Sequence, residues 1–167
     1  MKKPLMVVAI AAAAVAFLLW WFSATQVLKR RVSSLIDTAV VPASMSDIGR
    51  GARGPNVAEF VAGSLEIDSP PSLAQDLGPD LNRDTVSALY SAVAKYCRSI
   101  TVNDLKIQSV DVDGETATVR FSADAVVDLP DRRPVDGIVD VDSRWRKTDG
   151  KWLLERFAWT ESPRSAP

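Results

Sequence analysis

The sequence predicts an α+β protein in which an N-terminal membrane helix precedes one small domain, and helices of that domain cover an antiparallel sheet. Three observations support this fold class. Residues 5–22 are uniformly apolar, residues 84–99 carry apolar side chains at helical spacing, and residues 105–160 alternate apolar and polar side chains. A chain of 167 residues has room for one domain and an anchor.

The anchor is predicted from residues 5–22 (LMVVAIAAAAVAFLLWWF), which contain no charged or polar side chain. As a helix this segment rises roughly 27 Å, about the hydrocarbon thickness of a bilayer. Trp20, Trp21 and Phe22 lie at the end of the run, where aromatic side chains of the membrane interface belong. A cleaved signal peptide is the alternative, but bulky Phe22 would occupy the −3 position of a cut after Ala24. We therefore expect residues 1–26 to be an uncleaved signal anchor.

The orientation of this anchor is less strongly encoded. Lys2 and Lys3 flank one side and residues 29–31 (Lys-Arg-Arg) flank the other, so the positive-inside rule is nearly balanced and both topologies stay open. Signal-like N-termini usually direct the rest of the chain across the membrane. We expect a single-pass protein of the cytoplasmic (inner) membrane with its C-terminal domain on the periplasmic side.

Charge and composition exclude several classes of function. The net charge is −1, and without Lys2 and Lys3 the remaining chain carries −3, so no basic footprint for nucleic acid exists. The sequence has no histidine and a single cysteine, Cys97. The commonest general base, the commonest zinc ligand and any intrachain disulfide are therefore missing. We expect no metal, no cofactor and no nucleic-acid partner.

Helical signals dominate the first half of the domain. Residues 27–40 read as a juxtamembrane helix. The glycine-rich segment 49–55 lacks phosphate-loop spacing, so a flexible loop is expected there. A short helix capped by Asn56, a short strand over 64–68 and a helix capped by Asp84 should come next. The division is an anchor (1–26), a juxtamembrane helix and loop (27–56), the α+β domain (57–160) and a disordered tail (161–167).

The last third reads as a meander of four strands. Asp113-Gly114 and Asp149-Gly150 predict hairpin turns, the first of type I′. The expected covered face includes Ala117, Val119, Phe121, Ala123, Ala125, Val139, Val141, Ser143 and Trp145. One-sided alternation means one covered and one solvated face, so Asp140 and Asp142 are expected on the surface and not in a catalytic pair.

The register of the last hairpin is open between three solutions. A plain two-residue turn places Arg156 on the covered face and Phe157 and Trp159 outside. A bulged three-residue loop does the reverse. A bulge midway along the strand lets four large side chains point inward: Trp152, Leu154, Phe157 and Trp159. We expect this last solution because it covers all four.

Residues 110–119 (VDVDGETATV) and 145–154 (WRKTDGKWLL) resemble the central and final hairpins of the nuclear transport factor 2-like, or cystatin-like cone, superfamily. The resemblance covers about residues 57–160. It implies a curved sheet wrapped around helices that leave a cone-shaped cavity. Some members are enzymes, such as ketosteroid isomerase and scytalone dehydratase. Other members are non-catalytic domains that follow a single N-terminal membrane helix in type IV secretion systems or in proteins associated with mycobacterial lipid-import complexes. The predicted anchor and domain of this chain are similar to that arrangement.

The resulting functional hypothesis is a non-catalytic, membrane-anchored interaction or assembly domain. It would serve as an accessory or scaffold component of a membrane complex or as a homo-oligomer, with Phe157 and Trp159 facing the partner. The alternative is a pocket for a small apolar ligand, with or without isomerase or hydratase activity. Its predicted lining is Tyr90, Phe121, Ser143, Trp145 and Arg156. A deep cavity with an inward Asp–Tyr pair would favour the alternative.

Overall fold

The computed structural model describes residues 20–68 and 80–162. The elements are α2 (Ala24–Ala39), α3 (Asp47–Ala58), β1 (Val61–Asp68), β2 (Asp80–Asn82), α5 (Arg83–Tyr96), β3 (Ser99–Asp113), β4 (Thr116–Asp128), β5 (Val135–Thr148) and β6 (Lys151–Ser162). Most of the predicted anchor and residues 163–167 of the predicted tail lie outside the described residues, whereas Glu161 and Ser162 belong to β6 and not to a disordered tail. Within them, no helix combines the length and apolarity needed to cross a membrane.

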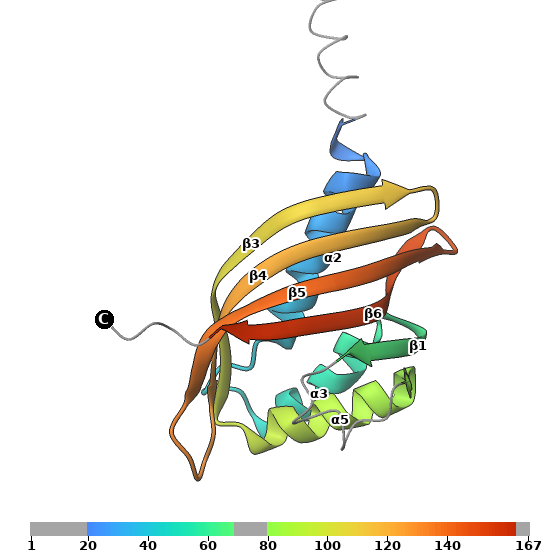
Figure 1. The fold of residues 1–167 in the computed structure, drawn as a ribbon. Coiled ribbons are helices and arrows are strands. Elements are labelled where there is room, and N and C mark those ends of the chain that lie inside the picture. Colours follow the sequence, from blue (N-terminus) through green and yellow to red (C-terminus); the bar gives the residue numbers. More distant parts are fainter. Residues whose placement is uncertain (1–19, 69–79, 163–167) are drawn as a thin grey trace, which may run out of the picture.

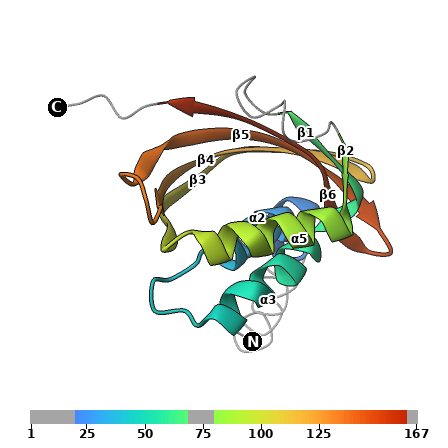
Figure 2. The ribbon, with the colours of Figure 1, turned by 90° about the horizontal axis from the view of Figure 1, so that it is seen from below.

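The strands form one curved sheet that arches over the helices (Figures 1 and 2). Its order is β2-β1-β6-β5-β4-β3, with β6 parallel to β1 and every other neighbouring pair antiparallel. The expected purely antiparallel sheet is thus corrected to a mixed one. The correction arises because the last strand returns to lie beside β1, and that long-range pairing leaves no local signal in the sequence.

Helix α2 fills much of the concave side of the sheet. Leu28 and Val32 are buried in one cluster with Val119, Phe121 and Trp145. Full burial of each such side chain contributes about 1.5–3 kcal/mol to the free energy of unfolding. The juxtamembrane helix and the strands therefore share a single hydrophobic core.

The glycine-rich segment 49–55 is helical, not a flexible loop, because it belongs to α3. Ser46 caps the helix by accepting a hydrogen bond from the Gly49 amide (3.2 Å). Pro55 has no N–H for the carbonyl of Gly51, four residues earlier. The Ser91 hydroxyl of α5 donates to that carbonyl instead (2.9 Å). A tertiary contact thus supplies the hydrogen bond to the Gly51 carbonyl that Pro55 cannot donate.

The start of α5 and the first hairpin differ in detail from expectation. Asn82, not Asp84, caps α5, and its side chain accepts from the Thr85 amide (2.8 Å). In the β3–β4 hairpin the central residues are Gly114 and Glu115, and only Gly114 has a positive φ (58°). That pattern is typical of a type II′ turn and not of the predicted type I′.

The last hairpin confirms the expected mixed register. Asp149 and Gly150 both have positive φ, as a type I′ turn requires. Trp145 pairs with Leu154 and Arg144 pairs with Arg156, which leaves Glu155 as a bulge. The bulge rotates the rest of β6 by one position. Trp152 and Leu154 before it and Phe157 and Trp159 after it therefore all pack on the concave side.

Candidate functional site

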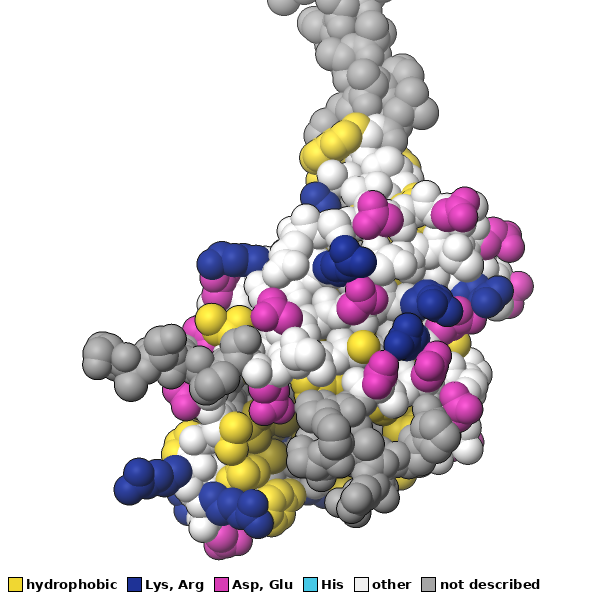
Figure 3. All heavy atoms as spheres, in the orientation of Figure 1, with side chains coloured by type: hydrophobic (Ala, Val, Ile, Leu, Met, Phe, Trp, Pro, Cys, Tyr) yellow, Lys and Arg dark blue, Asp and Glu magenta, His cyan; other side chains and the backbone are white. Residues whose placement is uncertain are grey.

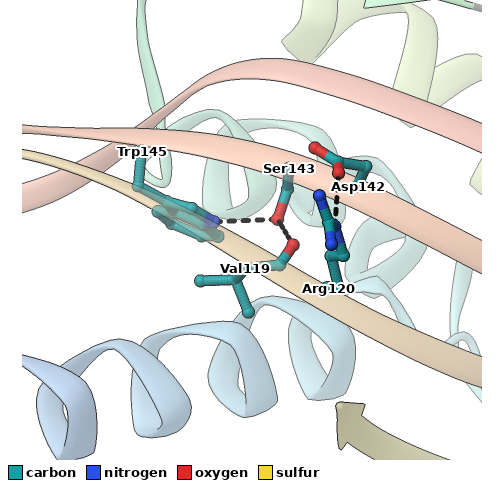
Figure 4. Close-up of polar contacts among 5 residues, drawn as sticks. All are labelled: Val119, Arg120, Asp142, Ser143 and Trp145. Carbon is teal, nitrogen blue, oxygen red and sulfur yellow. Dashed lines mark hydrogen bonds and ion pairs between the residues drawn. The ribbon is translucent and has the colours of Figure 1, made fainter. Parts of the chain in front are cut away.

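Three of the predicted pocket residues are sealed in the core. Phe121, Ser143 and Trp145 are buried, with Trp145 at 0% exposure. The indole nitrogen of Trp145 donates to Ser143 Oγ (3.0 Å), and this hydroxyl donates to the carbonyl of Val119 (2.8 Å; Figure 4). These polar atoms satisfy one another, so the three residues line no open cavity. Leu28 and Val32 of α2 belong to the same cluster and fill the space that a ligand would need.

Arg156 lies on the opposite face of the sheet, which corrects its assignment to the pocket. Its Nη2 is 2.9 Å from Asp68 Oδ2, and its Nε is 3.7 Å from Glu66 Oε1. The same bulge that turns Arg156 outward turns Phe157 and Trp159 inward, where their rings pack in a tilted pair with centroids 5.5 Å apart. The two aromatic residues are therefore not an outward, partner-facing patch.

Tyr90 is held against the end of α2. Its hydroxyl donates to the carbonyl of Ala39. Burial is the main reason that the pKa of Tyr90 is raised to about 12, an effect that nearby Arg53 opposes. The phenol therefore stays protonated at physiological pH and serves as a donor, not as a base.

The Tyr90 pKa predicts a loss of stability in alkali. In the unfolded chain the phenol ionises near pH 10, whereas the folded protein keeps its proton up to about pH 12. Over that window wild type should lose about 1–2 kcal/mol relative to Tyr90→Phe. At pH 8 the phenylalanine variant should be less stable by about 1 kcal/mol because its hydrogen bond is gone. Urea unfolding at pH 8 and pH 11.5 measures both values; a constant difference between the two proteins would contradict the assignment.

The open part of the concave side lies at α5. This helix packs against α3 and the short strands β1 and β2, without substantial contact to β4, β5 or β6. Val86 and Tyr90 on its inner face reach the core cluster. Leu89 and Val93 continue the same stripe at helical spacing, yet they are 39% and 45% exposed. The stripe is therefore only partly covered by the sheet.

We define the cone mouth as Val86, Leu89 and Val93 of α5 with Phe157 and Trp159 of β6. The sheet arches over α5 in Figure 2, and Figure 3 shows hydrophobic side chains gathered in a hollow beside the bent strand ends. The inward positions of β4 and β5, and those of β6 up to Trp159, carry no carboxyl group. The surface that the described residues offer here is apolar and aromatic, which suits an uncharged ligand.

The outer face of the sheet has a different character. Side chains of both charges alternate over it (Figure 3), among them Arg120 and Asp142, whose Nε and Oδ2 atoms are 2.9 Å apart. Beside this pair lies a shallow groove of about 670 Å³. The groove is lined in part by Ala158, which has a small side chain and pairs with Asp68 of β1 on one side and Asp142 of β5 on the other. The predicted surface position of Asp140 and Asp142 agrees with this placement.

Exposed aromatic residues stand at the N-terminal end of the described chain. Trp20, Trp21 and Phe22 are all exposed, and the Arg30 guanidinium lies 4.4 Å from the ring centre of Trp21. This is the predicted membrane-interface set. No group of side chains able to hold a metal ion is found in residues 20–68 and 80–162.

Comparison with known proteins identifies the fold. No family model and no curated protein match the chain. Among solved structures, a provisionally named scytalone dehydratase from Novosphingobium aromaticivorans aligns at 18% identity and a TM-score of 0.60, over 82% of this chain and 83% of that one. A provisionally named dehydratase of the nuclear transport factor 2-like family from Streptomyces avermitilis aligns at 16% identity and 0.58, over 83% and 95%.

A third neighbour, a protein with a cystatin-like fold from Novosphingobium aromaticivorans, aligns at 16% identity and 0.57, over 93% of this chain and 90% of that one. The chain has the nuclear transport factor 2-like fold. The expectation from the two hairpins is confirmed at that level. Identities this low establish a shared architecture and leave function to be argued from the site.

The cone mouth was only half visible in the sequence. The helical stripe containing Leu89 and Val93 predicts a core face, but periodicity does not indicate how completely that face is covered. Cover depends on how far the bent sheet stands from α5, and that distance is set by the bulges and by the β1–β6 pairing.

Proposed function

We propose that this protein binds a small apolar molecule at the cone mouth while its N-terminal segment holds it to a membrane. The observation that carries the proposal is the exposure of Leu89 and Val93 on the helix face turned toward the concave side. Apolar surface that faces a concavity is stabilised by an apolar ligand, because binding removes both surfaces from water.

The chemistry of the lining narrows the ligand class. The adjacent, tilted rings of Phe157 and Trp159 favour a flat or aromatic ligand, since aromatic pairs gain about 0.5–1.5 kcal/mol beyond area burial. The lack of carboxyl groups among the cone-mouth residues, and at the inward positions of β4, β5 and β6 up to Trp159, favours an uncharged ligand. Neighbours of the same fold are named as a dehydratase, a scytalone dehydratase and an aromatic ring hydroxylase, names that fit small-molecule chemistry in this architecture. Because the described lining offers no general acid or base, the proposal is binding and not turnover.

The membrane part of the proposal rests on the residues that join the domain to the apolar run. Exposed Trp20, Trp21 and Phe22 suit the interface, and the basic residues Lys29 and Arg30 suit the headgroup region. We propose a periplasmic domain on an uncleaved inner-membrane anchor. A C-terminal alkaline phosphatase fusion should be active, and the intact mass of the purified protein should include residues 1–26.

Ligand binding is tested with N-phenyl-1-naphthylamine, a neutral apolar fluorescent probe, and the full chain in dodecyl maltoside. Wild type should bind the probe saturably. Leu89→Asp should weaken binding about 10-fold or more, since a carboxylate in an apolar site costs at least about 1.4 kcal/mol. Trp159→Ala should lower affinity in the same direction.

Ile48→Asp is the matched control, because Ile48 is 88% exposed on α3 and lies outside the cone mouth. It should bind the probe like wild type. Equal loss in Leu89→Asp and Ile48→Asp would mean that the probe reports general surface apolarity or the micelle. That result would remove the cone mouth as the binding site.

An assembly domain is the second candidate, and the groove over Ala158 on the outer face favours it. A partner, or another copy of this chain, would bind there and would share only Trp159 with the cone mouth. Native mass spectrometry of the full chain released from nanodiscs separates the candidates. A monomer with a small adduct supports the ligand proposal, whereas a defined oligomer or heteromer without one supports assembly.

A further inference from the structure

Strands β1 and β6 separate in the middle of their pairing. Val61 lies opposite Leu154 and Glu66 lies opposite Arg156, so residues 62–65 of β1 face the single residue Glu155 of β6. The hydrogen-bond ladder between two strands cannot continue where four residues lie opposite one. The strands part there, and a Cβ added at Gly63 would meet no heavy atom within 4 Å. A cleft of about 890 Å³ opens between β1, the β5–β6 hairpin and α2.

Two arginines are fixed at this cleft by backbone carbonyls. Arg31 donates from Nε to the carbonyl of Trp152 (3.2 Å) and from Nη2 to that of Glu59 (3.0 Å). Arg83 donates from Nε and Nη2 to the carbonyl of Val61 (3.0 and 2.6 Å). Among the described residues, neither guanidinium has a carboxylate within ion-pair distance. Their positions are held, but their charges are not directly neutralised.

The remaining charges leave the cleft slightly positive. Lys151 is exposed at its rim, and Arg146 is paired with Glu155. Glu59 and Asp149 also line it, which makes four basic against three acidic side chains. Burial lowers the pKa of Arg31 more than nearby Glu59 raises it, as expected for a cation that has lost part of its hydration.

We propose that this cleft is a binding site for an oxyanion, the phosphate or carboxylate group of a soluble molecule or of a lipid. Arg31 and Arg83 each keep donor N–H groups that their carbonyl contacts do not use, and a guanidinium presents such donors in a geometry that matches an oxyanion. Lys151 adds a mobile cation at the rim. The site is separate from the cone mouth and from the outer-face groove, so it does not depend on either proposed function.

The test is isothermal titration of the full chain in dodecyl maltoside with inorganic phosphate and, separately, with dihexanoyl phosphatidylglycerol. Binding of phosphate alone indicates a soluble ligand, and binding of the lipid alone indicates a headgroup; either supports the site. Arg83→Gln should weaken binding about 10-fold, which corresponds to about 1.4 kcal/mol. Lys151→Gln, at an exposed position, should weaken it about threefold without affecting folding.

Two further variants separate a local site from general charge. Glu59→Gln should tighten binding about threefold, because it removes a repelling carboxylate from the cleft wall. Lys147→Gln makes the same charge change as Lys151→Gln on the same hairpin but outside the cleft, and should bind like wild type. No binding of either probe at millimolar concentration, or equal weakening by Lys147→Gln and Lys151→Gln, would overturn the proposal.

Discussion

Replacing Gly54 by alanine should destabilise the protein by about 3 kcal/mol or more, because α3 and α5 cross in close contact at this residue. A Cβ at position 54 would lie 2.0 Å from the carbonyl oxygen of Ser87 and 2.1 Å from Ser91 Oγ. The first of these atoms is backbone and cannot rotate away. The helices must therefore separate, which would also stretch the Ser91 hydrogen bond to Gly51.

The Gly54 prediction is measured by urea unfolding of the full chain in detergent, followed by far-ultraviolet circular dichroism. Gly51→Ala is the matched control in the same helix. Its new Cβ would meet only the flexible end of Lys95, at 3.1 Å, so gained helix propensity of about 1 kcal/mol should leave it neutral or stabilised. Similar unfolding midpoints for the Gly54→Ala and Gly51→Ala proteins would show that the helices are not in tight contact.

Replacing Arg50 by methionine should cost about 3–5 kcal/mol, because it strips a buried cation from the carbonyls it satisfies. Arg50 is 7% exposed. Its guanidinium donates to the carbonyls of Met45, Ala94, Cys97, Pro42, Ala43 and Arg98, at 2.6–3.4 Å. Three of these carbonyls stand at the C-terminal end of α5, where the helix dipole favours a positive charge.

Lysine tests what kind of cation this site needs. Arg50→Lys keeps the charge but has one nitrogen, which cannot bridge α5 and the loop before α3 at once, so it should still lose about 2–3 kcal/mol. Arg53→Met is the control in the same helix, since Arg53 donates only to the carbonyl of Thr38 (3.1 Å) and should cost about 1 kcal/mol. Full stability of Arg50→Lys in urea unfolding would mean that charge alone matters and not the planar fork.

Both positions lie in the segment 49–55, for which the sequence predicts a flexible loop. Three glycines and a proline lower helix propensity by several kcal/mol in all, and the Ser46 cap, which contributes about 1 kcal/mol, offsets only part of that loss. The compensation comes from contacts with α5. Gly54 lets α5 approach closely, and the Ser91 hydroxyl donates a hydrogen bond to the Gly51 carbonyl. The carbonyls at the C-terminal end of α5 accept hydrogen bonds from Arg50. Helix α3 exists because of a partner some 40 residues away along the chain.

The candidate site likewise depends partly on local sequence pattern and partly on contacts between distant segments. Periodicity in α5 and alternation in β5 and β6 predicted which side chains turn inward. Trp152, Leu154, Phe157 and Trp159 can all face the core only if a bulge interrupts β6, and the structure has that bulge at Glu155. The pocket predicted around Trp145 is closed because α2 packs into the concave side, although α2 precedes the domain that the sequence predicts over residues 57–160. Its apolar stripe, which includes Val32 and Leu35, was visible, but the surface that would cover it was not.

The sequence alone determined the meander, the inward faces of its strands and the hairpin turn at Asp149-Gly150, since each depends on neighbours within a few residues or on one hairpin. The two hairpin motifs also carried the resemblance to the nuclear transport factor 2-like fold. Tertiary structure decided the parallel β1–β6 pairing, the helical state of α3, the filled space beneath Trp145 and the cleft beside Gly63. These depend on contacts between segments distant in the chain, where packing energies exceed local propensities.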